Sequence, residues 1–272
     1  MITLRRGAFY LTLIIVAVVM VFPFYWMLST SLKGPREVLL YPPTVFPNRL
    51  TLENYTQIAV EAAFPQYLMN SVLVVGASTL VAIFTSCIGG YIFAKFRFPG
   101  RNFLFVLILA TTMIPFQTYM VPLYLMMKDF QLIDTYLAIM APLFITSFGI
   151  FFIRQNTLAI PDELIDAARI DGAGEWYIFK NIIVNLLIAP ISAVTIFTSM
   201  FGWKFFIWPL IITNSPDKFV LELGLSSLAQ KNALDFGVQM AGAVFSIIPI
   251  LAVFLTLRKR FVRGITMTGL KG

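Results

Sequence analysis

The chain has 272 residues, of which 59% are apolar and only 12% are charged, and its mean hydropathy is +0.85. A soluble domain has about 45–50% apolar and about 25% charged residues, so these values predict a polytopic membrane protein. The sequence contains no histidine, which excludes a histidine-based metal site or catalytic triad within this subunit, and its single cysteine excludes an internal disulfide.

Six hydrophobic stretches are long enough to cross a bilayer, which requires about 20 apolar residues. The first follows Arg5 and Arg6, but it is too long for a signal peptide and lacks a small-residue cleavage site, so we expect a retained helix. The fifth is longer than needed and contains Pro190 and Pro209, so we expect it to be kinked, tilted or broken. The prediction is an all-α protein whose six transmembrane helices cover approximately residues 8–31, 67–94, 103–127, 136–153, 182–212 and 238–257.

Lysine and arginine are distributed unequally between the two sides of this arrangement. If the N-terminus is inside, the inner segments hold thirteen of the twenty basic residues and the outer loops hold six, with Lys204 left within the fifth span. Cytoplasmic loops carry an excess of Lys and Arg, so both termini are predicted to be cytoplasmic. Topology and contact with anionic lipid headgroups then explain the net charge of +7 without any binding of nucleic acid.

The inner segment 157–180 contains five acidic residues in a pattern typical of a helix. Pro161 suits the first turn, where its missing N–H would have no partner. Asp162 and Glu163 place negative charge against the positive end of the helix dipole. A membrane-surface helix is the alternative, but such helices favour a polar face rich in Lys and Arg.

The same segment contains small residues where a helix would meet another surface or end. Ala167 and Ala168 allow another surface to approach the helix backbone closely. Gly172 is expected to end the helix in the left-handed conformation, and a second short helix is expected over about residues 174–180. Within the second span, Ser86 and Gly90 favour close packing against a neighbouring helix.

The pattern Asp166-Ala-Ala-x-x-x-Gly172 followed by Ile182-x-Val184 resembles the EAA loop of the membrane subunits of bacterial ABC importers. The surrounding sequence resembles the carbohydrate-uptake (maltose permease-like) subgroup of the binding-protein-dependent transport inner-membrane family. The residues that carry this second resemblance are Pro23–Lys33, Leu52–Tyr55, Asn70-Ser71, Tyr91–Arg101, Met113–Pro115, Trp203–Leu210, Arg260–Gly264 and Lys271-Gly272.

The sequence departs from the family pattern at three places. Asp166 replaces the leading glutamate, which keeps the charge but shortens its reach. Val184-Asn185 replaces the usual leucine–proline pair, so the proline that would mark entry into the fifth helix is absent. Lys204-Phe205 stands where relatives often have Asn-Asp after a tryptophan.

The resemblance implies a type I ABC importer permease fold in the cytoplasmic (inner) membrane, with no cofactor and no ATPase site of its own. No Gly-x-x-x-x-Gly-Lys-Ser/Thr loop occurs in the sequence, so work done by ATP must arrive through a contact. The implied partners are a second homologous permease subunit, a dimer of ATP-binding subunits, an extracytoplasmic solute-binding protein, a carbohydrate substrate and membrane lipid. The implied coupling residues are Asp162, Glu163, Asp166, Ala167, Ala168, Asp171 and Gly172.

The long outer loops 33–66 and 213–237 are, on the same resemblance, the landing surface for the solute-binding protein. Their acidic residues are Glu37, Glu53, Glu61, Asp217, Glu222 and Asp235. The alternative is that these loops are solvated connectors without a partner.

Lys204 is unusual because an ammonium group in the hydrocarbon region costs about 2.5–3.5 kcal/mol unless it faces water or a partner. Trp203, Lys204 and Phe205 are therefore candidates for the translocation pathway, where the lysine would contact sugar hydroxyls or an anionic sugar. The alternative is that Lys204 extends to the outer headgroups or pairs with the partner subunit.

Two other classes of protein compete with an ABC sugar permease. A self-contained secondary transporter or channel would need intramembrane acids for ion coupling, but all thirteen Asp and Glu fall outside the predicted spans. An integral membrane enzyme is disfavoured because the chain has no histidine and no cluster of intramembrane carboxylates.

Overall fold

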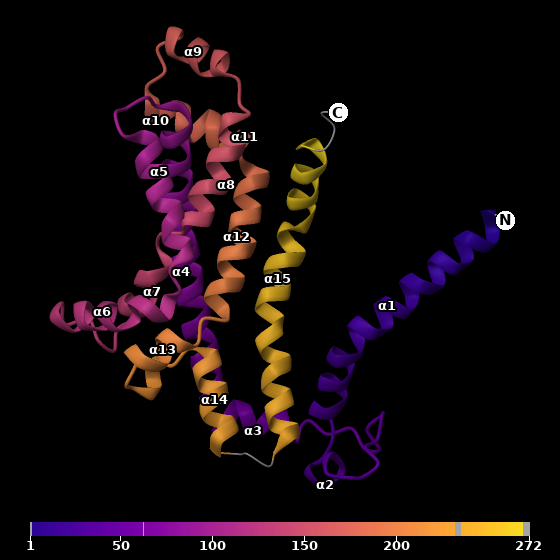
Figure 1. The fold of residues 1–272 in the computed structure, drawn as a ribbon. Helices are drawn as coiled ribbons and strands as arrows, with labels where there is room; N and C mark the ends of the chain where they lie inside the picture. The colour runs from indigo at the N-terminus through magenta and orange to yellow at the C-terminus, as the bar shows by residue number, and fades with distance from the viewer. Residues whose placement is uncertain (1, 62, 232–234, 269–272) are drawn as a thin grey trace. The chain divides into compact units, whose positions relative to one another are not determined.

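The computed structural model describes residues 2–61, 63–231 and 235–268 (Figure 1). Lys271 and Gly272, which contribute to the charge count and to the resemblance, lie outside the described residues. The chain divides into two compact units, one of Met1–Leu68 with Leu223–Ile248 and the other of Met69–Glu222 with Pro249–Gly272.

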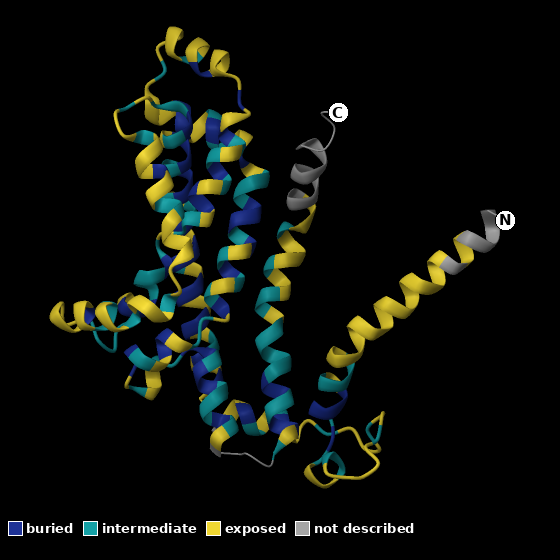
Figure 2. Cartoon of the chain, in the orientation of Figure 1, coloured by how far each residue is buried: buried dark blue, intermediate teal, exposed yellow. Residues whose placement is uncertain are grey.

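The first unit contains α1 (Ile2–Ser31), α2 (Pro35–Val38), α3 (Glu53–Glu61), most of α14 (Leu221–Lys231) and the first part of α15 (Phe236–Thr268). The apolar side chains of α1 are exposed along most of its length (Figure 2), which suits a helix surrounded by lipid or by another subunit. The end of α1 is held by Asn54, whose side-chain amide donates to the carbonyls of Ser31 and Lys33 at 2.8 Å each.

The second unit contains most of α4 (Phe64–Lys95) and the elements that follow it as far as Glu222. These elements are α5 (Arg101–Ala110), η1 (Thr111–Met113), α6 (Phe116–Asp129), α7 (Tyr136–Met140), η2 (Ala141–Leu143), α8 (Ser147–Leu158), α9 (Asp162–Ile170), α10 (Glu175–Tyr177), the π-helix η3 (Ile178–Ile183), α11 (Val184–Leu186), α12 (Ile188–Trp203), α13 (Ile207–Ile212) and η4 (Pro216–Lys218).

Three helices in the described part of the chain can cross a membrane without a break: Phe9–Ser31, Phe64–Lys95 and Phe236–Lys259. Three further pairs of helices are bent, by 102° between Arg101–Met113 and Phe116–Asp129, by 43° between Tyr136–Leu143 and Ser147–Leu158, and by 78° between Glu175–Leu186 and Ile188–Trp203. The number of spans is therefore up to six if each bent pair counts as one.

Two of the three bends, those of 102° and 78°, follow from proline and from the restriction it places on neighbouring residues. Ile114, which precedes Pro115, is extended at ψ 114°, so the helix that ends at Met113 cannot continue into α6. Pro190 has no N–H to donate to the carbonyl of Leu186, and the chain breaks at Leu187 between α11 and α12. The break expected in the fifth stretch is thus present, but a second break at Lys204–Phe206 also separates α13 from α12.

The packing of α4 against α8 depends on small residues. A Cβ on Gly90 would lie 2.5 Å from Cγ2 of Ile153, and a Cβ on Gly149 would collide with the hydroxyl of Ser86. The close packing predicted from Ser86 and Gly90 is confirmed. Beneath this contact, parts of α4, α8, α9, η3 and α12 form one buried cluster of Cys87, Tyr91, Ile153, Ile160, Ile165, Ile178, Phe179, Ile183, Leu187 and Val194.

Candidate coupling site

The charged segment forms the helix α9, which begins one residue later than the sequence indicates. Pro161 is extended, at φ −57° and ψ 137°, so it precedes the helix as its N-cap rather than lying in the first turn. Asp162 and Glu163 occupy that first turn, where their charges face the positive end of the helix dipole.

The end of α9 is a sharp stop built on Gly172. This residue has φ +84°, the left-handed conformation expected from the sequence. The N–H of Gly172 donates to the carbonyl of Arg169 at 3.0 Å, and that of Ala173 donates to the carbonyl of Ala168 at 2.9 Å. This pair of bonds is a Schellman motif, which satisfies carbonyls that a helix end would leave unpaired.

One side of α9 is buried and the other is open. Ile165 is 2% exposed within the buried cluster, and Ala168 packs against the same cluster. Ile170, in contrast, is 86% exposed and Leu164 is half-exposed. We call the exposed residues Glu163, Leu164, Asp166, Ala167, Ile170 and Asp171 the outer face of α9; they combine acidic and apolar side chains (Figure 2).

The beginning of α9 is bound to the end of α4. The Nζ of Lys95, the last residue of α4, donates to the carbonyl oxygen of Ile160 and to Oδ1 of Asp162. The Lys95 side chain is only 7% exposed, whereas that of Asp162 is 74% exposed. The hydrogen bond from Lys95, with its positive charge, holds the pKa of the Asp162 carboxyl below its usual value.

The end of α9 is bound to the same helix through a second set of polar contacts. Arg169 donates through Nε to Oε1 of Glu175 at 2.7 Å and through Nη1 to Oδ1 of Asp166 at 3.0 Å. Oε2 of Glu175 accepts a hydrogen bond from the hydroxyl of Tyr91 in α4 at 3.1 Å. The bond to Glu175 is the main reason that the pKa of Arg169 is raised.

Together, these contacts hold α9 to α4 at both of its ends. We call Tyr91, Lys95, Asp162, Arg169 and Glu175 the clasp. Of these five residues, only Asp162 is among the coupling residues that the resemblance implies. The sequence does contain a signal that could have indicated the contact. Tyr91 and Lys95 are four residues apart and therefore lie on one face of a helix.

The residues predicted for the pathway do not all gather in one place. Trp203 is buried and Phe205 is half-buried, and both line a cavity of about 10 Å³ with residues of α4 and α7. Lys204 is exposed, caps the end of α12 and is not part of that lining. The structure thus places Lys204 at a break between helices rather than inside a continuous fifth span.

Asp134 holds the beginning of the outer loop 213–237 in place, although the sequence analysis did not single this residue out. Its carboxylate accepts bonds from the amides of Asn214 and Ser215 at 3.0 Å each, from the Ser215 hydroxyl and from Nζ of Lys218 at 3.1 Å. Burial opposes ionisation of Asp134, but these hydrogen bonds outweigh it and lower the pKa of the carboxyl well below its usual range.

At least two acidic residues of the outer loops accept hydrogen bonds from other residues of this chain. Glu37 accepts from the Thr44 hydroxyl at 3.0 Å and from the Asn48 amide at 2.7 Å. Oδ1 of Asp235 accepts from the amide of Val238 at 3.1 Å in the first turn of α15. In the described residues, no group of three or more Cys, Asp or Glu side chains is placed to hold a metal ion.

Known proteins match this chain over most of its length. A family model described as "binding-protein-dependent transport system inner membrane component" matches residues 86–267, which include α9 and the whole clasp. The arabinooligosaccharides transport system permease protein AraQ of Halalkalibacterium halodurans is 35% identical over 260 residues, covering 94% of this chain and 93% of the relative. The lactose transport system permease protein LacG of Rhizobium radiobacter is 33% identical, covering 97% of each chain.

The description of a third relative names a phosphorylated compound. The sn-glycerol-3-phosphate transport system permease protein UgpE of Brucella suis is 30% identical and the match covers 95% of each chain. Among solved structures, a chain of a bacterial ABC transporter involved in the import of the acidic polysaccharide alginate has a TM-score of 0.83 at 20% identity, covering 95% of this chain and 97% of that chain. The likeness shows that the two chains share an all-helical fold.

Proposed function

Because the chain belongs to the family of binding-protein-dependent transport system inner membrane components, we propose that it is the permease subunit of an ATP-driven importer that moves a carbohydrate across the cytoplasmic membrane. ATP hydrolysis belongs to a separate subunit in such a complex. The alternative of a self-contained secondary transporter or channel has no comparable support from the relatives.

The outer face of α9 is the observation that carries the coupling role. It exposes acidic and apolar side chains together, and its opposite side is packed and clasped to α4. A helix held in this way moves with the bundle instead of bending away from it. We propose that Asp162, Glu163, Asp166, Ala167, Ala168, Asp171 and Gly172 form the ATPase-coupling segment, with the outer face docked in a groove of the ATP-binding subunit.

The clasp determines which helices would move with α9. Asp166 is bound to Arg169 inside this chain, so its role is to fix the helix as much as to face a partner. Work done on α9 would pass to α4 through Lys95 and Tyr91, as well as to the helices on either side of α9. Rocking of such a bundle around a central site is how alternating access is achieved in many transporters.

The family is described as binding-protein-dependent, so a binding protein is part of the transport complex. We propose that this protein lands on the outer loops 33–66 and 213–237, and that a second homologous permease and a dimer of ATP-binding subunits complete the complex. The exposed apolar surface of α1 supports a neighbouring subunit or lipid, because helix faces in a membrane pack on either. Both termini and α9 would lie in the cytoplasm.

The substrate class rests on the relatives, whose descriptions name arabinooligosaccharides, lactose and sn-glycerol-3-phosphate. These are sugars or a phosphorylated polyol, so the cargo proposed here is a sugar, an oligosaccharide or a sugar derivative, neutral or anionic. Trp203, Lys204 and Phe205 remain proposed as pathway residues, with Lys204 acting from the break between α12 and α13.

The docking proposal is tested by placing a bulky residue on the outer face. Ala167 is exposed, so Ala167→Trp leaves the packing of this chain intact while blocking close approach of a partner. We expect recovery of the ATP-binding subunit with the tagged permease to fall several-fold. Arg49→Trp, at an exposed position of the first outer loop, is the matched control and should have no effect. Equal recovery with both variants would refute docking at this face.

A further inference from the structure

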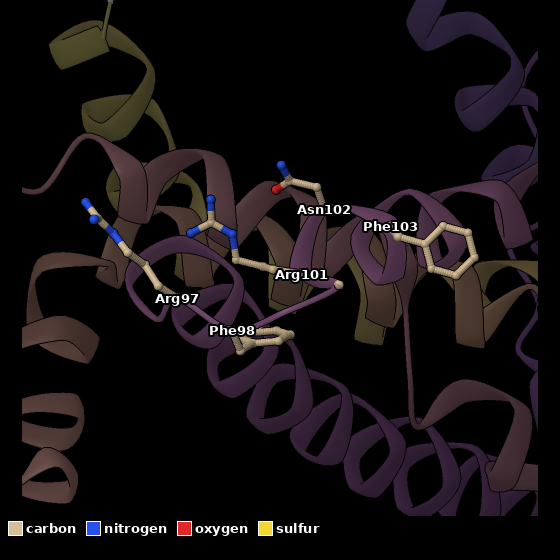
Figure 3. A pocket seen from close by; sticks show the side chains of 6 residues that line it. Arg97, Phe98, Arg101, Asn102 and Phe103 are labelled. Carbon is tan, nitrogen blue, oxygen red and sulfur yellow. The ribbon is translucent and has the colours of Figure 1, made fainter.

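The turn between α4 and α5 contains a basic cavity that the coupling site does not use. It has a volume of about 300 Å³ and is lined by Arg97, Phe98, Gly100, Arg101, Asn102 and Phe103. Figure 3 shows the guanidinium groups of Arg97 and Arg101 and the amide of Asn102 on the same side of the turn. We propose that this cavity binds the phosphate group of an anionic phospholipid at the membrane surface.

The charge of the cavity is positive and is not neutralised by an ion pair. Neither Arg97 nor Arg101 forms a salt bridge with a carboxylate in the described part of the chain. Nη1 of Arg101 donates to the carbonyl of Phe96 at 3.1 Å, which fixes the guanidinium over the turn. Asp162 is close enough for its pKa to be lowered by the charge of Arg97, but it is already bound to Lys95.

The chemistry of the lining matches a phosphate. A guanidinium presents parallel N–H donors that bind phosphate oxygens in pairs, and two of them can share one phosphate group. The side-chain amide of Asn102 adds a further donor. Gly100, at φ +80°, ends the turn without a side chain that would cap α5 or fill the cavity.

The apolar lining is the reason for choosing a lipid instead of free phosphate. Phe103, in the first turn of α5, is 71% exposed, whereas the half-buried Phe98 packs on Phe93 of α4 with 5.9 Å between the ring centroids. Phe103 thus adds an exposed apolar ring to the lining of the basic cavity, which directly follows α4, a helix long and apolar enough to cross a membrane. A soluble phosphate would leave the Phe103 ring exposed, whereas a phospholipid would cover it with its chains.

Retention of lipid by the purified complex tests the proposal. The assembled complex, in detergent with added phosphatidylglycerol or phosphatidylcholine, is analysed by native mass spectrometry. We expect the double variant Arg97→Gln with Arg101→Gln to bind phosphatidylglycerol about 30-fold more weakly. This corresponds to about 2 kcal/mol, at about 1 kcal/mol for each arginine near an anionic surface. Retention of phosphatidylcholine should not change.

Two matched variants separate a built site from general positive charge. Arg36→Gln with Arg49→Gln removes the same charge from the first outer loop and should retain phosphatidylglycerol as the wild type does. Arg97→Lys with Arg101→Lys keeps the charge but loses the paired donors, and should bind at an intermediate level. Equal loss from both glutamine pairs would overturn the proposal, because it would reflect net charge alone.

Competition distinguishes the two sources of phosphate. Inorganic phosphate at millimolar concentration should not displace phosphatidylglycerol if the acyl chains contribute, and displacement would overturn the lipid assignment. The measurement reads bound lipid and not transport. A failure here would therefore leave the coupling role of α9 untouched, and a failure of that role would leave this site in place.

Discussion

Gly172 is the residue on which the end of α9 depends. Its φ of +84° is a conformation that side chains with a Cβ disfavour, yet a Cβ at this position would meet no atom within 4 Å. The effect of a substitution would therefore come from the backbone alone and not from a clash. This separation makes Gly172 a clean test of whether the direction of the chain after α9 matters.

Gly172→Val should raise the cost of the left-handed turn by about 1–2 kcal/mol and turn the chain away from its present path. We expect the complex to assemble while carbohydrate uptake per ATP hydrolysed falls several-fold in proteoliposomes. Gly172→Asn is the control, because asparagine tolerates this conformation better than other non-glycine residues. If valine and asparagine variants give the same ratio of uptake to hydrolysis, the turn is not a coupling joint.

The contribution of Asp134 to stability should depend on pH. Its pKa is lowered in the folded protein, so the stabilisation from ionisation is complete above the ordinary carboxyl pKa and is lost progressively as the pH falls from there through the lower folded pKa. Asp134→Asn should therefore lower the unfolding temperature equally at pH 7 and pH 5. The difference from wild type should shrink below about pH 4. A difference that already shrinks between pH 7 and pH 5 would contradict this account.

The clasp consists of contacts between helices that the sequence motif alone does not predict. The sequence predicted α9, its acidic first turn and its glycine stop, because each of these depends on neighbouring residues. Lys95 was interpreted as one of the inner basic residues and as part of the resembling segment Tyr91–Arg101, and no partner was predicted for it, since a charge at the end of a span explains topology without one. Its contact with Asp162 joins residues 67 positions apart, and neither hydropathy nor helix periodicity reports on such a pair.

Lys95→Met should separate the beginning of α9 from α4 without unfolding the protein, because Asp162 is largely exposed and remains solvated. We expect normal expression, normal recovery of the ATP-binding subunit and reduced uptake per ATP hydrolysed. Lys95→Arg should restore part of the coupling. Lys180→Met, at an exposed lysine outside the clasp, is the control. Loss of expression or of assembly in Lys95→Met would point to a general role in stability instead.

The bends in the helices explain why the stretches predicted from hydropathy differ from the helices observed. The stretch 103–127 was expected as one span, but it consists of helices at 102° to each other. Met113-Ile114-Pro115 was noticed only as part of the resemblance, although the proline restricts Ile114 to an extended conformation. A hydropathy window averages over such a residue, so it finds the apolar stretch but not its break.

For the whole molecule, composition predicted the class of protein correctly, while the orientation derived from charge placement stays a prediction. The exposed apolar side chains of helices such as α1 agree with surroundings of lipid and other subunits (Figure 2). The substrate could not be predicted, because Trp203 and Phe205 line only a cavity of about 10 Å³ within this subunit. A carbohydrate is larger than this cavity, so the cavity alone does not hold one.

The role of Lys204 depends on what surrounds the chain. If Lys204 faces the path of the substrate, Lys204→Met should slow uptake several-fold without changing expression or ATP-binding subunit recovery. Lys128→Met, at an exposed lysine near the end of α6, is the matched control. Normal uptake by Lys204→Met would favour contact with outer headgroups.

The most direct test of the central claim is photo-crosslinking from the outer face of α9. A photoreactive amino acid is placed at position 167 in cells that express the whole transport system, and another is placed at position 49 for comparison. We expect position 167 to crosslink to the ATP-binding subunit and position 49 not to do so. Crosslinking of position 167 to the extracytoplasmic solute-binding protein, or to neither protein while position 49 reaches the ATP-binding subunit, would contradict it.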